Sequence, residues 1–172
     1  YLGFGLAQNQ RALDVARDLA QARGHTPVQL GVKPSFANLM VWKSVYQHQG
    51  YYYVDAVRVG LAVTVYSGTR SRVLDVATQF PWLHEESQQR KDIERFRWFS
   101  DDHLGVDPDD HNRVIDVRYS LIPNRLDGMW GIELNPQAGP DQHVQFVTKR
   151  PQGDDLKAET SLLWQMILGR PI

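Results

Sequence analysis

Apolar positions near the start of the chain recur at the spacing of an α-helix. Leucine and alanine residues lie on one side of this stretch and charged residues on the other. Gly24 and Pro27 then interrupt the pattern. Glycine is common just past a helix C-terminus, and proline cannot continue a helix far. The pattern therefore predicts a helix over residues 6–23.

Three stretches rich in valine, tyrosine and tryptophan follow, in residues 38–46, 51–59 and 61–67. They are close in sequence, so antiparallel pairing is expected, with a hairpin loop at residues 47–50. A largely exposed helix follows Pro81 and includes residues 84–93. Four more strands are predicted, separated by turn-forming residues, at 94–99, 114–121, 129–134 and 143–148.

The chain closes with an apolar helical face made by Leu162, Leu163, Met166 and Ile167, which predicts a helix over residues 156–168. The order is therefore helix, strands, helix, strands, helix. Strands that cluster in runs favour the α+β class over an alternating βαβ fold. We expect a mostly antiparallel sheet of six to seven strands, on which N-terminal, middle and C-terminal helices pack.

Length, composition and charge narrow the possible functions. The 172 residues fit one domain with a sizeable core. Nineteen basic and 20 acidic residues give a formal net charge of −1, which argues against nucleic acid as a partner. There is no cysteine, so disulfides and Cys-based metal sites are excluded. No apolar run is long enough to span a membrane. The chain begins at Tyr1 without an initiator Met, from which we expect a missing upstream part.

Arginines alternate with aromatic residues in the predicted strand 94–99. On such a strand Arg95 and Arg97 share a face, and on the strand 114–121 Asp116 and Arg118 share another. If the two strands are neighbours, these four residues form a cluster with excess positive charge, suited to holding phosphate or carboxylate. The predicted binding residues are Arg95, Arg97, Asp116, Arg118, Trp98 and Tyr119. The alternative to an anion-binding site is that these residues lie on the solvent-exposed face of an antiparallel sheet.

Catalytic and metal-binding signals are weak. The six histidines show no His-x-His or His-Glu-x-x-His spacing. Only the acidic stretch with Asp101, His103 and His111 approaches a metal-ligand constellation, and a solvated loop explains it better. Ser44, Ser100 and Ser120 have no readable triad context, because sequence spacing cannot place a base beside them. No metal site and no catalytic residue is assigned within this chain.

Several motifs in a fixed order give a resemblance to a known family. They are Arg11-Ala12, Arg23-Gly24-His25, Lys33-Pro34-Ser35 with Asn38, Trp42-Lys43-Ser44-Val45-Tyr46, Asp55-Ala56-Val57-Arg58, Phe80-Pro81-Trp82, Arg95-Phe96-Arg97-Trp98-Phe99-Ser100, Asp116-x-Arg118-Tyr119, Met129-Trp130-Gly131-Ile132 and His143-Val144. Together they resemble the C-terminal soluble part of the YdjM-like family of inner-membrane predicted metal-dependent hydrolases. One departure is Asp102-His103, where the family pattern has a small residue and an aromatic residue.

The resemblance implies a soluble domain, residues 1–172, that follows several membrane helices of a longer bacterial inner-membrane protein. It also implies that a divalent metal is held in that missing membrane region and that none is held here. We expect an accessory or substrate-binding domain that binds a lipid or other anionic substrate through the arginine cluster. Its own upstream membrane helices would be its partner, with a slight preference for the periplasmic side. The alternative is a non-enzymatic protein-interaction or self-association domain.

Overall fold

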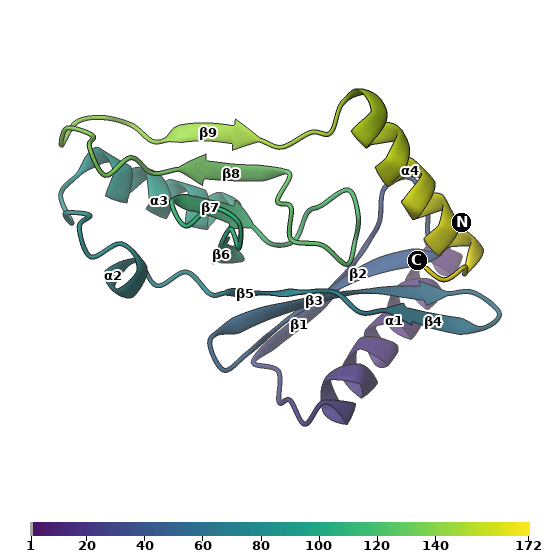
Figure 1. Cartoon of the computed structure of the whole chain (residues 1–172). Helices are drawn as coiled ribbons and strands as arrows, with labels where there is room; N and C mark the ends of the chain where they lie inside the picture. Colours follow the sequence, from purple (N-terminus) through teal and green to yellow (C-terminus); the bar gives the residue numbers. More distant parts are fainter. Residues whose placement is uncertain (1) are drawn as a thin grey trace.

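Two antiparallel β-sheets and four helices make up residues 2–172, which are the part of the chain that the computed structural model describes (Figure 1). Tyr1, on which the expectation of an upstream segment rests, lies outside the described residues. The predicted α+β class is confirmed, as are antiparallel pairing and N-terminal, middle and C-terminal helices. The strands number nine in two sheets instead of six to seven in one.

The first sheet has the order β1-β2-β3-β4, and the short β5 also pairs with β3. Its strands are β1 (Gln29–Pro34), β2 (Val41–His48), β3 (Tyr51–Val59), β4 (Val63–Tyr66) and β5 (Arg70–Arg72). The second sheet has the order β6-β7-β8-β9. Its strands are β6 (Leu104–Val106), β7 (Arg113–Asp116), β8 (Trp130–Glu133) and β9 (Gln145–Thr148).

Helix α1 (Leu2–Ala22) covers one face of the first sheet (Figure 1). It buries a row of small residues, Ala12, Ala16 and Ala20, at helical spacing. Trp42 of β2 packs from the sheet into the same cluster. Just beyond the helix, Arg23 Nη1 lies 2.7 Å from an oxygen of the fully buried Asp55 carboxylate. This ion pair joins the end of the helix to β3.

The opposite face of the first sheet is covered by the rest of the molecule. Helix α4 (Gly153–Leu168) packs there through Leu163 and Met166. A long loop between β7 and β8, residues 117–129, covers the remaining surface through Val117, Ile122 and Leu126. We call residues 117–129 the junction loop, because it lies between the two sheets.

The second sheet has its own core, which is closed by the short α2 (Val76–Gln79) and by α3 (Gln88–Phe99). This core contains Leu74, Val76, Phe80, Ile93, Phe96, Leu104, Val114, Ile132 and Leu134. Ser87 caps α3, because its hydroxyl accepts a hydrogen bond from the Arg90 amide.

One predicted strand is wrong, and several boundaries differ. Residues 94–99 form the second half of α3, not a strand. Strands β1, β5 and β6 were not predicted, and the strand expected over 114–121 ends at Asp116, where the junction loop begins. Among the helices of residues 2–172, none is long and apolar enough to cross a membrane.

Candidate functional site

A buried lysine lies under the junction loop. Lys43 belongs to β2, and its side chain shares a face with Val41 and Val45, which lie in the clusters that bury this side of the sheet. It is 3% exposed. Its Nζ donates to Ser120 Oγ at 2.8 Å and to the Arg125 carbonyl at 2.7 Å. Neither acceptor carries a negative charge, so the ammonium group is held by dipoles alone.

The environment of Lys43 favours the neutral amine. Burial lowers the pKa of Lys43 from its ordinary value of 10.5 to about 7, although Asp127 and Asp116 partly offset this effect. The amine therefore titrates near neutral pH. Lys33 is the direct β-ladder neighbour of Lys43, and its Nζ donates to the Tyr119 hydroxyl at 3.2 Å. Two lysines thus hold consecutive residues of the junction loop, Tyr119 and Ser120.

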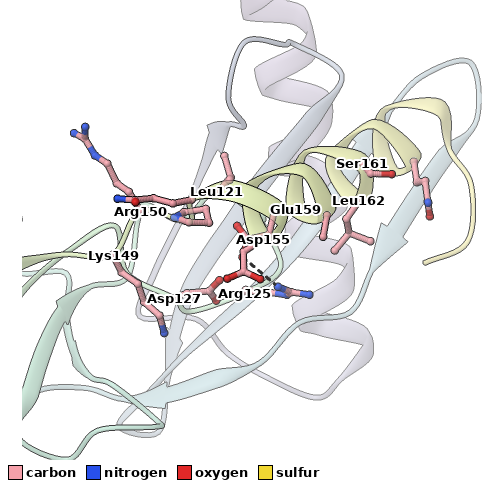
Figure 2. A pocket seen from close by; sticks show the side chains of 13 residues that line it. Leu121, Arg125, Asp127, Lys149, Arg150, Asp155, Glu159, Ser161 and Leu162 are labelled. Carbon is pink, nitrogen blue, oxygen red and sulfur yellow. Dashed lines mark ion pairs between the residues drawn. The ribbon is translucent and has the colours of Figure 1, made fainter.

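A cleft of about 920 Å³ opens between the junction loop and α4 (Figure 2). The junction loop supplies Leu121, Arg125 and Asp127, and the segment before α4 supplies Lys149 to Gln152. Helix α4 completes the lining with Asp155, Ala158, Glu159, Ser161, Leu162 and Gln165. Arg125 connects the cleft to the buried lysine, because its carbonyl accepts from Lys43 while its side chain lines the cleft.

Charges of both signs meet in this cleft. Arg125, Lys149 and Arg150 are basic, whereas Asp127, Asp155 and Glu159 are acidic. The one ion pair drawn in Figure 2 joins Arg125 Nη1 to Glu159 Oε1 at 3.7 Å. Burial, followed by the nearby Asp127 carboxylate, raises the pKa of Glu159 above its ordinary value, and Arg125 opposes this effect. A ligand with an anionic and a cationic group matches such a lining.

The arginines predicted to share a strand face lie instead on different sides of α3, and each has an acidic partner. Arg95 Nη1 is 3.4 Å from Asp92, one turn earlier on the helix. Arg97 Nε is 3.3 Å from Glu94, and its Nη1 also contacts Asp102. Because residues 94–99 are helical, the two arginines do not share a face as they would on a strand. Each instead forms an ion pair with an acidic residue three positions earlier.

The other predicted binding residues lie near the C-terminus of α3. Arg118 forms a forked ion pair with the fully buried Asp116, with Nη2 at 2.7 Å from Oδ2, and it also donates to the Phe99 carbonyl. Its guanidinium lies 5.2 Å from the ring centre of Tyr119. These three residues therefore come together, whereas Trp98 is 86% exposed on α3. All three arginines of the predicted cluster are neutralised by carboxylates.

The acidic stretch 101–111 is occupied by turns and a short strand. His103 Nδ1 contacts the backbone carbonyl of Asp101 at 2.6 Å, and His111 lies in a separate surface pocket beside Asp107. Within residues 2–172, no group of three or more His, Asp and Glu side chains is arranged to hold a metal ion. His103 and His111 of this stretch therefore lie apart and do not form a metal-ligand constellation with its acidic residues.

Comparisons with known proteins add no relative. No family model, no curated protein and no solved structure matches this chain. The site is therefore interpreted from its own geometry.

Sequence reasoning missed Lys43, Arg125 and Glu159. One signal for Lys43 was present in the sequence. Val41, Lys43 and Val45 are alternate residues of a strand and share a face, on which an apolar residue is expected at position 43. Ser120 was considered as a nucleophile without a neighbouring base, and the structure places the Lys43 amine beside it. No local signal identifies Arg125 or Glu159, which meet only because α4 packs against the junction loop.

Proposed function

We propose that this chain is a substrate-binding or accessory domain that binds a small molecule with an anionic group in the cleft between the junction loop and α4. One observation carries the proposal. The cleft has basic side chains at Arg125, Lys149 and Arg150, and acidic ones on the facing helix. Its volume of about 920 Å³ lies within the range of small-molecule sites in proteins.

The anion would contact Lys149 or Arg150, whose side chains point to different sides in Figure 2 and have no ion-pair partner within 4.0 Å among the described residues. Arg125 is shared with Glu159. A positive group on the ligand would contact Asp155 or Glu159 on α4. A phosphate ester with an amine, such as a phosphoethanolamine headgroup, therefore fits both signs of charge.

The larger assignment, to a membrane-bound predicted metal-dependent hydrolase, is supported by the ordered sequence motifs. In that assignment this domain selects or holds the substrate, and the hydrolytic metal belongs to another part of the protein. Arg97 of α3 and Arg118 of the junction loop are each paired with a carboxylate, so the expected anion contact moves from these residues to the cleft.

Calorimetric titration with phosphoethanolamine tests the binding. The double variant Lys149→Gln/Arg150→Gln should weaken binding about tenfold or more, because it removes two charge-assisted hydrogen-bond donors. Inorganic phosphate should bind more weakly than phosphoethanolamine, since it has no amine for Glu159. The matched control is Lys91→Gln on the exposed face of α3, which should leave binding unchanged.

Two results would contradict the proposal. One is an absence of measurable heat with both probes. The other is equal affinity in the wild type and the Lys149→Gln/Arg150→Gln variant.

A further inference from the structure

Exposed apolar side chains lie on the first turns of α1, on β4 and the turn before it, and on the last turns of α4 with the C-terminus. Leu61, in the turn between β3 and β4, is 109% exposed, and Leu6 on α1 is 73% exposed. We call this surface the apolar end. Its exposed residues are Phe4, Leu6, Leu61, Val63, Val65, Trp164, Leu168 and Ile172.

Hydrogen bonds hold the three parts of the apolar end together. Arg11 Nη2 on α1 donates to the Gly60 carbonyl at 2.8 Å, in the β3–β4 turn. Arg58 Nε on β3 donates to the Ile167 carbonyl of α4 at 2.8 Å, and its Nη1 donates to the Ala62 carbonyl. Figure 1 shows the C-terminus at the end of α4, with the turn between β3 and β4 at the same end of the molecule. The three elements that carry the exposed apolar side chains are therefore fixed relative to one another.

The charge of the apolar end has a single sign. Residues 2–13, 56–66 and 160–172 contain no aspartate or glutamate, whereas they contain Arg11, Arg58 and Arg170. The hydrogen bonds of Arg11 and Arg58 go to backbone carbonyls and an amide oxygen, which leave their positive charges uncompensated.

The combination of apolar residues and arginines without a carboxylate partner favours an anionic lipid surface over a second copy of the chain as the occupant. A second copy of the chain would set the same arginines against each other with no acidic residue between them. A bilayer with anionic lipids accepts leucine, phenylalanine and tryptophan in its interfacial region and pairs arginine with lipid phosphate.

We propose that the apolar end rests on the surface of an anionic lipid bilayer, with Leu61 inserted and the three arginines at headgroup level. This inference goes beyond the function proposed above, because it names a surface that contacts a membrane. It rests on that function only for the location of the domain at a membrane. The cleft and the apolar end have no residue in common, although both include residues of the second half of α4. The two surfaces can therefore be tested separately.

Co-sedimentation with lipid vesicles tests the proposal. The whole chain should sediment with vesicles made of equal parts phosphatidylcholine and phosphatidylglycerol, and more weakly with phosphatidylcholine alone. Leu61→Glu should lower the partition coefficient on the mixed vesicles about tenfold, because it removes the most exposed apolar side chain and adds a negative charge. The matched control is Val28→Glu, at a residue that is 81% exposed in the loop after α1.

Two further measurements separate this proposal from the one for the cleft. Leu61→Glu should leave phosphoethanolamine binding unchanged, and Lys149→Gln/Arg150→Gln should keep most of the vesicle binding. The proposal is overturned if the wild type stays in solution with both vesicles, or if Val28→Glu loses as much binding as Leu61→Glu. Light scattering that reveals a dimer dissociated by Leu61→Glu would also overturn it, by assigning the surface to a second copy.

Discussion

Lys43 is a residue of the junction whose charge changes near neutral pH. Its amine is buried, and its two hydrogen-bond acceptors are a hydroxyl and a carbonyl. Transferring a charged amine from water to the protein interior costs free energy, and hydrogen bonds to uncharged groups offset only part of this cost. For this reason burial lowers the pKa of Lys43 to about 7. In the unfolded chain the amine is in water and titrates near 10.5.

The pH dependence of stability follows from these two pKa values. Between pH 7 and pH 10.5 the unfolded chain binds a proton at Lys43 that the folded chain has released, so this residue makes the free energy of unfolding rise with pH. Lys43→Met removes the titration. The free energy of unfolding of the variant, relative to that of the wild type, should therefore fall by roughly 2–5 kcal/mol across this interval.

Urea unfolding at several pH values measures this difference. The control Lys91→Met lies on the exposed face of α3 and should show a nearly constant difference from the wild type. A constant difference for Lys43→Met as well would show that folding does not lower the pKa of Lys43.

The sequence contains part of this site. Lys43 interrupts an apolar alternation, so its position on a buried face can be inferred from residues 41–45. Its contact with Ser120 cannot, because the two residues are 77 positions apart and the junction loop has no regular period. The arginines of 95–97 misled the prediction because alternation of arginine and aromatic residues over six positions also fits one turn and a half of helix.

Helix α3 shows which local features decide between helix and strand. Ion pairs at helical spacing join Arg90 to Glu94, Asp92 to Arg95 and Glu94 to Arg97. Its N-terminus is capped by Ser87, and its buried face has Ile93 and Phe96 at the i, i+3 spacing. The cap and the spacing were both readable from the sequence. The prediction instead ended the helix at Ile93 and gave its last turns to a strand.

A cap substitution tests how far α3 depends on Ser87. The Ser87 hydroxyl accepts from the Arg90 amide at 3.3 Å and donates to the His84 carbonyl at 2.7 Å. Ser87→Ala should lower the free energy of unfolding by about 1 kcal/mol, because the Arg90 amide loses its acceptor. Thermal and urea unfolding measure the change. Ser161→Ala on the exposed face of α4 is the control and should change stability by only a few tenths of a kcal/mol. Equal effects at both positions would exclude a capping role for Ser87.

At the scale of the whole molecule, the two sheets share apolar clusters. Val45, Tyr52 and Val54 of the first sheet pack with Ile115, Val117 and Leu126, which belong to β7 and the junction loop. Helix α4 follows the second sheet in sequence but packs on the first. Unfolding of either sheet would expose this shared cluster, so we predict that the expected single domain unfolds as one cooperative unit.

Ile115→Ala tests this cooperativity because Ile115 is fully buried in the shared cluster. The substitution should lower the free energy of unfolding by about 2–5 kcal/mol, as expected for a large-to-small change in a packed core. Unfolding followed by circular dichroism and by tryptophan fluorescence should give coincident transitions in the wild type and the variant. Trp42 lies in the first sheet and Trp130 in the second, so fluorescence reports on both. Two separated transitions in either protein would show that the sheets unfold independently. In that case the junction loop would be a linker and the Lys43 contacts a weak link between domains.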